Sequence, residues 1–147
     1  MAEYKYKTQI DAQIALGAMM PKVHEPNNLY AYRYIFINDI EGKNHKPPFI
    51  VKPERAVVKP GKCIPPVEGY ALSCYTDCDK AVEAYNNLVV ERPFLRKQLG
   101  DTLCSGTITN NDGNVTAPNI NTTHFELFEF VDCDMSNVFT TIEKSLV

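Results

Sequence analysis

Ionisable side chains interrupt two otherwise apolar stretches of the sequence, LYAYRYIFI at 29–37 and THFELFEFV at 123–131. Successive side chains of a β-strand point to opposite faces, so Arg33 shares one face with aliphatic residues while the tyrosines share the other. A buried cation must be paired, hydrogen-bonded or directed into a cleft, which makes Arg33 a candidate ligand-binding residue. In the alternative interpretation, the tyrosine face forms the core and Arg33 points to solvent.

The same alternation in the stretch at 123–131 places His124 and Glu126 on one face and Glu129 on the other. If this strand is central in a sheet, at least one of the two glutamates is partly buried, and its charge requires a cation or a ligand. An edge strand with one hydrated face, or a structural ion pair, would explain the pattern equally well.

A third segment, GYALSCYTDCDKAVEAY at 69–85, joins a strand led by glycine to a helix of the form A-x-x-x-Y. Together with the two stretches above, it resembles the ADP-ribosyltransferase fold over residues 29 to 130. The positions that carry this resemblance are Arg33, Gly69, Ser73, Tyr75, Thr76, Ala81, Tyr85 and Glu126.

The resemblance implies NAD as cofactor and cleavage of the bond between nicotinamide and ribose through a transition state like an oxocarbenium ion. It implies that Glu126 is catalytic, because a carboxylate there would stabilise the developing positive charge and orient the ribose hydroxyl. It also implies that Arg33, Ser73, Tyr75 and Tyr85 hold NAD. The chain lacks the E-x-E or Q-x-E pair and the S-T-S run of the family, so the resemblance fits an active enzyme or a degenerate binding domain.

A noncatalytic domain that binds a protein partner, as an inhibitor or accessory factor, is the alternative. The proline-rich segment 39–69 and the tyrosines of the strand at 29–37 would suit that function. Six cations lie within or beside the proline-rich part, as a solvated loop face or as a local basic patch. They are Lys43, Lys46, Lys52, Arg55, Lys59 and Lys62.

Composition narrows the functional classes. The net charge of -3 argues against sequence-independent nucleic-acid binding, and the acidic residues near the N-terminus argue against a signal peptide or a membrane segment. We therefore expect a cytoplasmic protein with no membrane association. The five cysteines are odd in number and indicate no disulfide framework. Cys74 and Cys78 lack a second pair, so no metal site is expected, and no local motif supports a Cys104 nucleophile with His124.

The elements that carry these residues predict an α+β fold, in which a single domain over residues 1–147 contains a mainly antiparallel sheet and two to four short helices. Strands are predicted at 29–37, 69–76, 102–108 and 123–131, with short edge pairings by residues 49–51 and 56–58. Helices are predicted from a cap at Thr8 to Ala18, from a cap at Asp77 or Asp79 to Pro93, at 93–99 before Gly100, and at 134–147.

Overall fold

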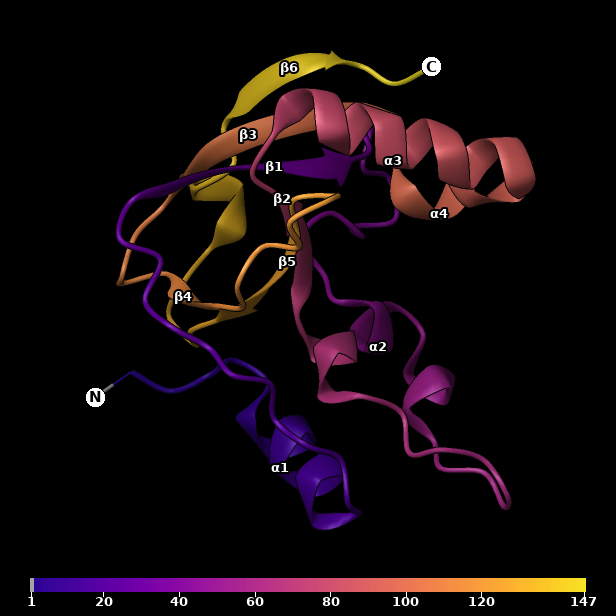
Figure 1. Cartoon of the computed structure of the whole chain (residues 1–147), viewed down its shortest axis with the longest axis vertical. Helices are drawn as coiled ribbons and strands as arrows, with labels where there is room; N and C mark the ends of the chain where they lie inside the picture. Colours follow the sequence, from indigo (N-terminus) through magenta and orange to yellow (C-terminus); the bar gives the residue numbers. More distant parts are fainter. Residues whose placement is uncertain (1) are drawn as a thin grey trace.

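A computed structural model describes residues 2–147 and confirms the α+β class. One antiparallel sheet contains six strands in the order β4-β5-β2-β1-β3-β6 (Figure 1). The strands are β1 (Leu29–Ile35), β2 (Leu72–Tyr75), β3 (Thr102–Ile108), β4 (Gly113–Val115), β5 (His124–Glu129) and β6 (Thr141–Ser145).

One long helix and several short ones accompany the sheet. Asp77 caps α3 by accepting a hydrogen bond from the amide of Lys80, as its sequence position predicts, and Pro93 follows the end of that helix. The α-helices are α1 (Lys7–Ala15), α2 (Pro48–Val51), α3 (Cys78–Glu91) and α4 (Arg96–Leu99). Single 3-10 turns are η1 (Pro53–Ala56), η2 (Val67–Tyr70), η3 (Pro93–Leu95) and η4 (Met135–Asn137).

Both faces of β1 are covered. Its aliphatic face joins the main core, in which Phe125 and Leu127 from β5 meet Met135 and Phe139 near η4. Its tyrosine face lies under α3, where Tyr34 donates a hydrogen bond to the carbonyl of Ala81. The predicted division of faces is therefore confirmed. Arg33 lies on the core side and is only 7% exposed, so the solvent-facing alternative is wrong.

The sheet separates between β1 and β2, and this separation creates the site described below. β1 pairs with β3 along its whole length, whereas its pairing with β2 is limited to Tyr32 opposite Tyr75. Continuing that register would place Tyr34 opposite Ser73, but no such pair forms. Figure 1 shows the result: β6, β3 and β1 run across one end of the molecule, while β2 and β5 descend from it.

The predicted C-terminal helix is wrong. Only Met135–Asn137 is helical, and residues Thr141–Ser145 form the edge strand β6 beside β3. The β-branched run from Thr140 to Ile142 favours a strand, and pairing with β3 satisfies backbone groups that a terminal helix would leave at an open sheet edge.

The proline-rich segment also differs from the prediction. Residues 49–51 belong to helix α2 and Ala56 to η1, so neither predicted edge pairing forms. Pro48 and Pro53 each occupy a first helical turn, where a missing amide proton costs little. Thr8 lies inside α1, which begins after Tyr6 without a side-chain cap, so the predicted capping box is also wrong.

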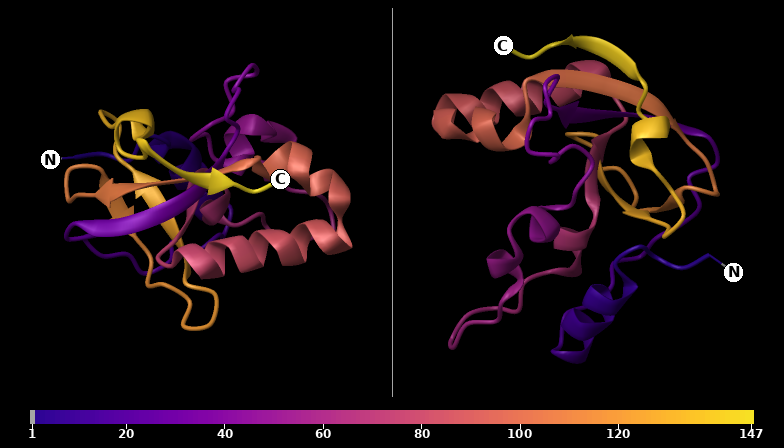
Figure 2. Two further views of the ribbon diagram at one scale, coloured as in Figure 1. Left: turned by 90° about the horizontal axis from the view of Figure 1, so that it is seen from above. Right: turned by 180° about the vertical axis from the view of Figure 1, so that it is seen from behind.

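No helix within residues 2–147 has the length and apolar character needed to cross a membrane. The loop that follows η1 projects as a narrow arm in the right-hand view of Figure 2. Val57 and Val58 at its base are exposed, as are Lys59 and Lys62.

Candidate functional site

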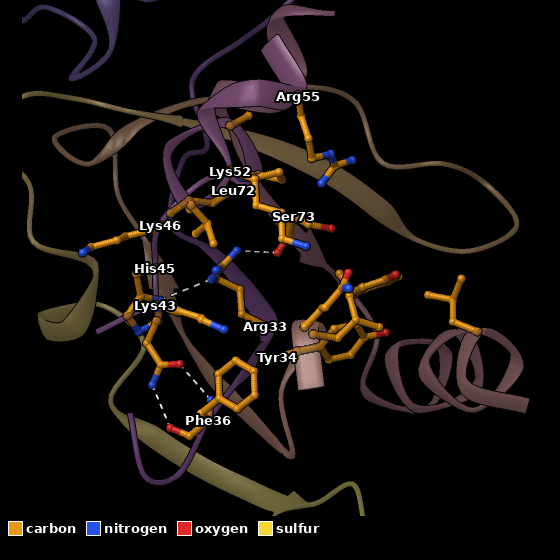
Figure 3. A pocket seen from close by; sticks show the side chains of 18 residues that line it. Arg33, Tyr34, Phe36, Lys43, His45, Lys46, Lys52, Arg55, Leu72 and Ser73 are labelled. Carbon is orange, nitrogen blue, oxygen red and sulfur yellow. Dashed lines mark hydrogen bonds between the residues drawn. The ribbon is translucent and has the colours of Figure 1, made fainter. Parts of the chain in front are cut away.

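A pocket of about 260 Å³ lies where β1 and β2 separate (Figure 3). Tyr34 near the end of β1 and Phe36 just after it line one wall, and Leu72 and Ser73 from the start of β2 line another. Further lining comes from the segment 43–55, from the residues that flank this part of β2, and from α3 and α4. The pocket therefore occupies the space that opens where backbone pairing between β1 and β2 stops.

Arg33 lies at the centre of this pocket (Figure 3). Its Nη1 donates a hydrogen bond of 2.6 Å to the backbone carbonyl of Ser73. In a continuous sheet this carbonyl would accept a hydrogen bond from a backbone amide of β1, and the guanidinium takes the place of that amide. Its Nε donates to Nδ1 of His45 at 3.3 Å, and its guanidinium lies 5.7 Å from the ring centre of Phe139. Within residues 2–147 the guanidinium makes no ion pair.

His45 acts as a neutral acceptor for Arg33. Burial, followed by the adjacent Arg33 charge, lowers the pKa of His45 to about 4, so the imidazole carries no charge at neutral pH. Its ring stacks on Phe139 with centres 5.7 Å apart. The Arg33 charge is therefore held by neutral groups, an arrangement that leaves a net positive charge in the pocket.

Side-chain hydrogen bonds fix the loop that carries His45. The carboxylate of Asp39 accepts hydrogen bonds from the amides of Lys43 and Asn44. The Asn44 side chain then pairs with both the amide and the carbonyl of Phe36, at 2.8 Å each. Asn44 thus supplies what a neighbouring strand would supply at the end of β1, and it anchors the loop across the pocket.

Four further cations line the pocket, and none of the residues lining it is Asp or Glu. They are Lys43, Lys46, Lys52 and Arg55. Lys43 forms an ion pair with Glu41 at 2.6 Å, whereas the other three make none within the described chain. Lys59 and Lys62, the last two cations of the predicted cluster, are exposed and lie outside the lining. The basic cluster is therefore partly a pocket wall and partly a solvated loop.

A polar cluster adjoins the pocket through Ser73. The Ser73 hydroxyl oxygen lies 2.6 Å from Nε2 of His124, and Glu126 Oε1 lies 3.5 Å from the same nitrogen. Ser73 and Glu126 are directly opposite each other in the β2–β5 ladder, and Tyr75 is opposite His124. As predicted, His124 and Glu126 share one face of β5.

Glu126 does not line the pocket, although the Arg33 charge reaches it. Burial, with a smaller contribution from the Glu68 charge, raises the pKa of Glu126 to about 8, and Arg33 opposes this rise only in part. The carboxyl is therefore largely protonated at neutral pH. A carboxylate that stabilises positive charge must be ionised, so this environment is unfavourable for the role that the resemblance implies.

The other predicted NAD-binding residues are divided between the pocket and the core. Tyr75 lines the pocket, whereas Tyr85 is fully buried on α3 and donates a hydrogen bond to the carbonyl of Gly100. The structure thus brings together Arg33, Ser73 and Tyr75. Sequence reasoning missed His45 and Asn44, because their roles depend on how the loop folds back onto β1.

The remaining buried acid, Glu129, is structural. It lies on the core face of β5, which is an internal strand and not the edge strand of the first alternative, and it forms an ion pair of 2.9 Å with Lys5, as the second alternative predicts. Its Oε1 is buried without a hydrogen-bond partner among the described residues. All five cysteines are free, and within residues 2–147 no three His, Cys, Asp or Glu side chains are grouped to hold a metal ion.

Comparisons with protein-family models, with curated proteins and with solved structures gave no match to this chain.

Proposed function

We propose that this protein binds a small, phosphate-bearing anion in the pocket around Arg33. The observation that carries the proposal is a buried guanidinium without a carboxylate partner, surrounded by further cations in a pocket whose lining contains no acid. Buried charges in proteins are normally paired, so an unpaired one that faces a pocket favours a ligand of opposite charge.

The chemistry of the pocket fits phosphate oxygens. Nη2 of Arg33 makes no hydrogen bond within the described chain and remains a donor for a ligand oxygen. Lys52 and Arg55 are exposed cations on long, flexible side chains and are placed to bind a second phosphate group. An arginine can bind a phosphate through two parallel hydrogen bonds. The pocket volume lies just below the usual range for small-molecule sites, roughly 300 to 1,000 Å³, so the pocket fits a compact anionic group.

NAD is the candidate ligand that the ADP-ribosyltransferase resemblance supplies, and its pyrophosphate would lie between Arg33 and the loop cations. Tyr75 and Tyr34 present aromatic surface in the same pocket for a base or the nicotinamide ring. A binding domain is better supported than an enzyme that cleaves NAD, because Glu126 lies outside the pocket lining and favours its protonated form.

Calorimetric titration tests the proposal. We expect binding of pyrophosphate, ADP and NAD, and none of adenosine or free nicotinamide, because the anionic group supplies the recognition. The double variant Lys52→Gln/Arg55→Gln should bind about tenfold or more weakly. The matched control is Lys59→Gln/Lys62→Gln, which removes the same charge from the neighbouring arm outside the pocket and should leave affinity unchanged. Equal losses in both variants, or no binding by the wild type, would refute the pocket.

Release of nicotinamide from NAD separates binding from catalysis. If the domain is degenerate, as Glu126 favours, NAD binds without turnover. Turnover that disappears in Glu126→Gln while NAD binding persists would instead establish the catalytic form of the resemblance.

A protein-binding function is the second candidate, and one feature favours it. The arm formed by residues 57–66 projects from the molecule with exposed valines and lysines (Figure 1). The tyrosine face of β1 contributes less than the sequence suggests, because Tyr32 and Tyr34 pack under α3. A pull-down lost on deletion of residues 57–62, with the fold retained, would support this function.

A further inference from the structure

A serine and a histidine are in hydrogen-bonding contact beside the anion pocket. The Ser73 hydroxyl is 2.6 Å from Nε2 of His124, a diagonal pairing between neighbouring strands that long side chains reach easily. At this distance an imidazole takes the proton of a hydroxyl nucleophile as it attacks. Ser73 is an exposed residue, so its hydroxyl is open to an incoming reactant.

The surroundings of His124 suit a base. Its ring meets the ring of Tyr75 edge-on, with centres 5.3 Å apart, and this contact fixes its orientation. Burial lowers the pKa of His124, so the ring is neutral at pH 7 and Nε2 is free to accept a proton. Glu126 Oε1 lies 3.5 Å from Nε2, although its raised pKa keeps this carboxyl mostly neutral at pH 7. The carboxyl lies beside the nitrogen that contacts Ser73, so the three residues form a dyad with an adjacent acid.

Ser73 belongs to both sites. Its hydroxyl contacts His124, while its carbonyl accepts the hydrogen bond from Arg33 at the pocket. We infer that Ser73 is a nucleophile for acyl transfer, with His124 as its base, acting on esters whose anionic part binds in the Arg33 pocket. The assignment of Ser73 as the nucleophile depends only on its contact with His124. The assignment of the substrate class depends in addition on the proposed anion binding.

The reaction proceeds in two balanced steps. Ser73 Oγ attacks the ester carbonyl carbon and its proton moves to His124 Nε2; the bond to the leaving alkoxy group then breaks, and that group takes the proton as an alcohol. Water attacks the acyl-serine, its proton moves to His124, and Ser73 leaves with that proton restored to it. The net change is hydrolysis of an ester to an acid and an alcohol, with the enzyme regenerated.

A biotinylated fluorophosphonate tests the nucleophile, because a base-activated serine displaces its fluoride and retains the probe. We expect the label on Ser73 of the native protein by peptide mass spectrometry and none after denaturation. Ser73→Ala should lose it, and His124→Gln should label at least about tenfold more slowly. Ser136→Ala, an exposed serine far along the chain, is the control and should label normally.

Absence of label on Ser73, labelling of Ser136 to the same extent, or an unchanged rate in His124→Gln would overturn the nucleophile. If the label is absent from the wild-type protein but pyrophosphate still binds, the nucleophile is wrong and the proposed anion binding is retained. Failure of the nucleophile can therefore be distinguished from failure of anion binding. The substrate class is tested with the 4-nitrophenyl esters of succinate and butyrate. After subtraction of the rate without protein, which is high for succinate because its own carboxylate attacks the ester, the anionic succinate ester should be hydrolysed faster. Lys52→Gln/Arg55→Gln should abolish that preference, and equal protein-dependent rates in the wild type would overturn the class.

Discussion

The guanidinium of Arg33 donates to the backbone carbonyl of Ser73 at 2.6 Å although the strands that carry them have already separated. A charged side chain therefore bridges the two parts of the sheet where backbone pairing stops. This hydrogen bond does not neutralise the positive charge of Arg33. The buried guanidinium therefore faces the pocket with donors that an anionic ligand would satisfy.

Millimolar pyrophosphate should stabilise the wild-type protein by relieving repulsion among the pocket cations. We expect a rise in Tm of about 2 to 5 °C over chloride at equal ionic strength. Arg33→Met removes the central charge and should show no difference between the two salts. A similar rise in Arg33→Met would show that the anion binds elsewhere.

Asn44→Ala should loosen the loop over the pocket. The substitution removes two hydrogen bonds to the backbone of Phe36, at a cost of about 2 kcal/mol in the free energy of unfolding. Faster hydrogen exchange of the Phe36 amide and weaker pyrophosphate binding should accompany the loss. Asn121→Ala, at an exposed position, is the control; exchange at Phe36 that does not change in Asn44→Ala would contradict the anchoring role.

Glu126→Gln should stabilise the protein in alkaline solution. The folded-state pKa of Glu126 is raised from 4.5 to about 8, mainly by burial and then by the Glu68 charge, with Arg33 opposing the rise. The unfolded chain therefore releases this proton first, and the folded state loses stability as pH rises from about 4.5 to 8. We expect an advantage of about 2 kcal/mol for the variant at pH 8, allowing for partial exposure, and little at pH 4.5.

Urea unfolding at the two pH values measures that difference, with Glu83→Gln on the exposed side of α3 as the control. An advantage of Glu126→Gln that is constant with pH would show that the carboxyl titrates normally.

Gly106→Ala should strongly destabilise the fold. A Cβ atom at this position of β3 would overlap the backbone carbonyl of Val138, which cannot move without displacing Phe139 from the core. We expect a loss of about 3 kcal/mol or more, or failure to fold. Gly61→Asn is the comparison, since that position is open and its left-handed backbone suits asparagine; equal Tm values for both variants would refute the packing argument.

Sequence reasoning succeeded where local pattern determines structure. Alternation identified the aliphatic face shared by Arg33 and the common face of His124 and Glu126, because strand geometry fixes both. It failed at the C-terminus, where apolar spacing suggested a helix but the open edge of β3 selected a strand. The pocket was beyond prediction, since it depends on where two strands separate and on a distant asparagine folding back onto Phe36.

The single pairing of Tyr32 with Tyr75 also leaves a seam in the backbone hydrogen bonding of the sheet. Strands β1, β3 and β6 share one continuous ladder and β2, β4 and β5 share another, with few backbone hydrogen bonds joining them. Side chains from both ladders pack in the same main core, so the sheet is held together across the seam by apolar packing more than by backbone pairing. We expect amides at the seam to exchange at lower free energy than amides inside either ladder, and a ligand that contacts both sides of the seam to slow that exchange.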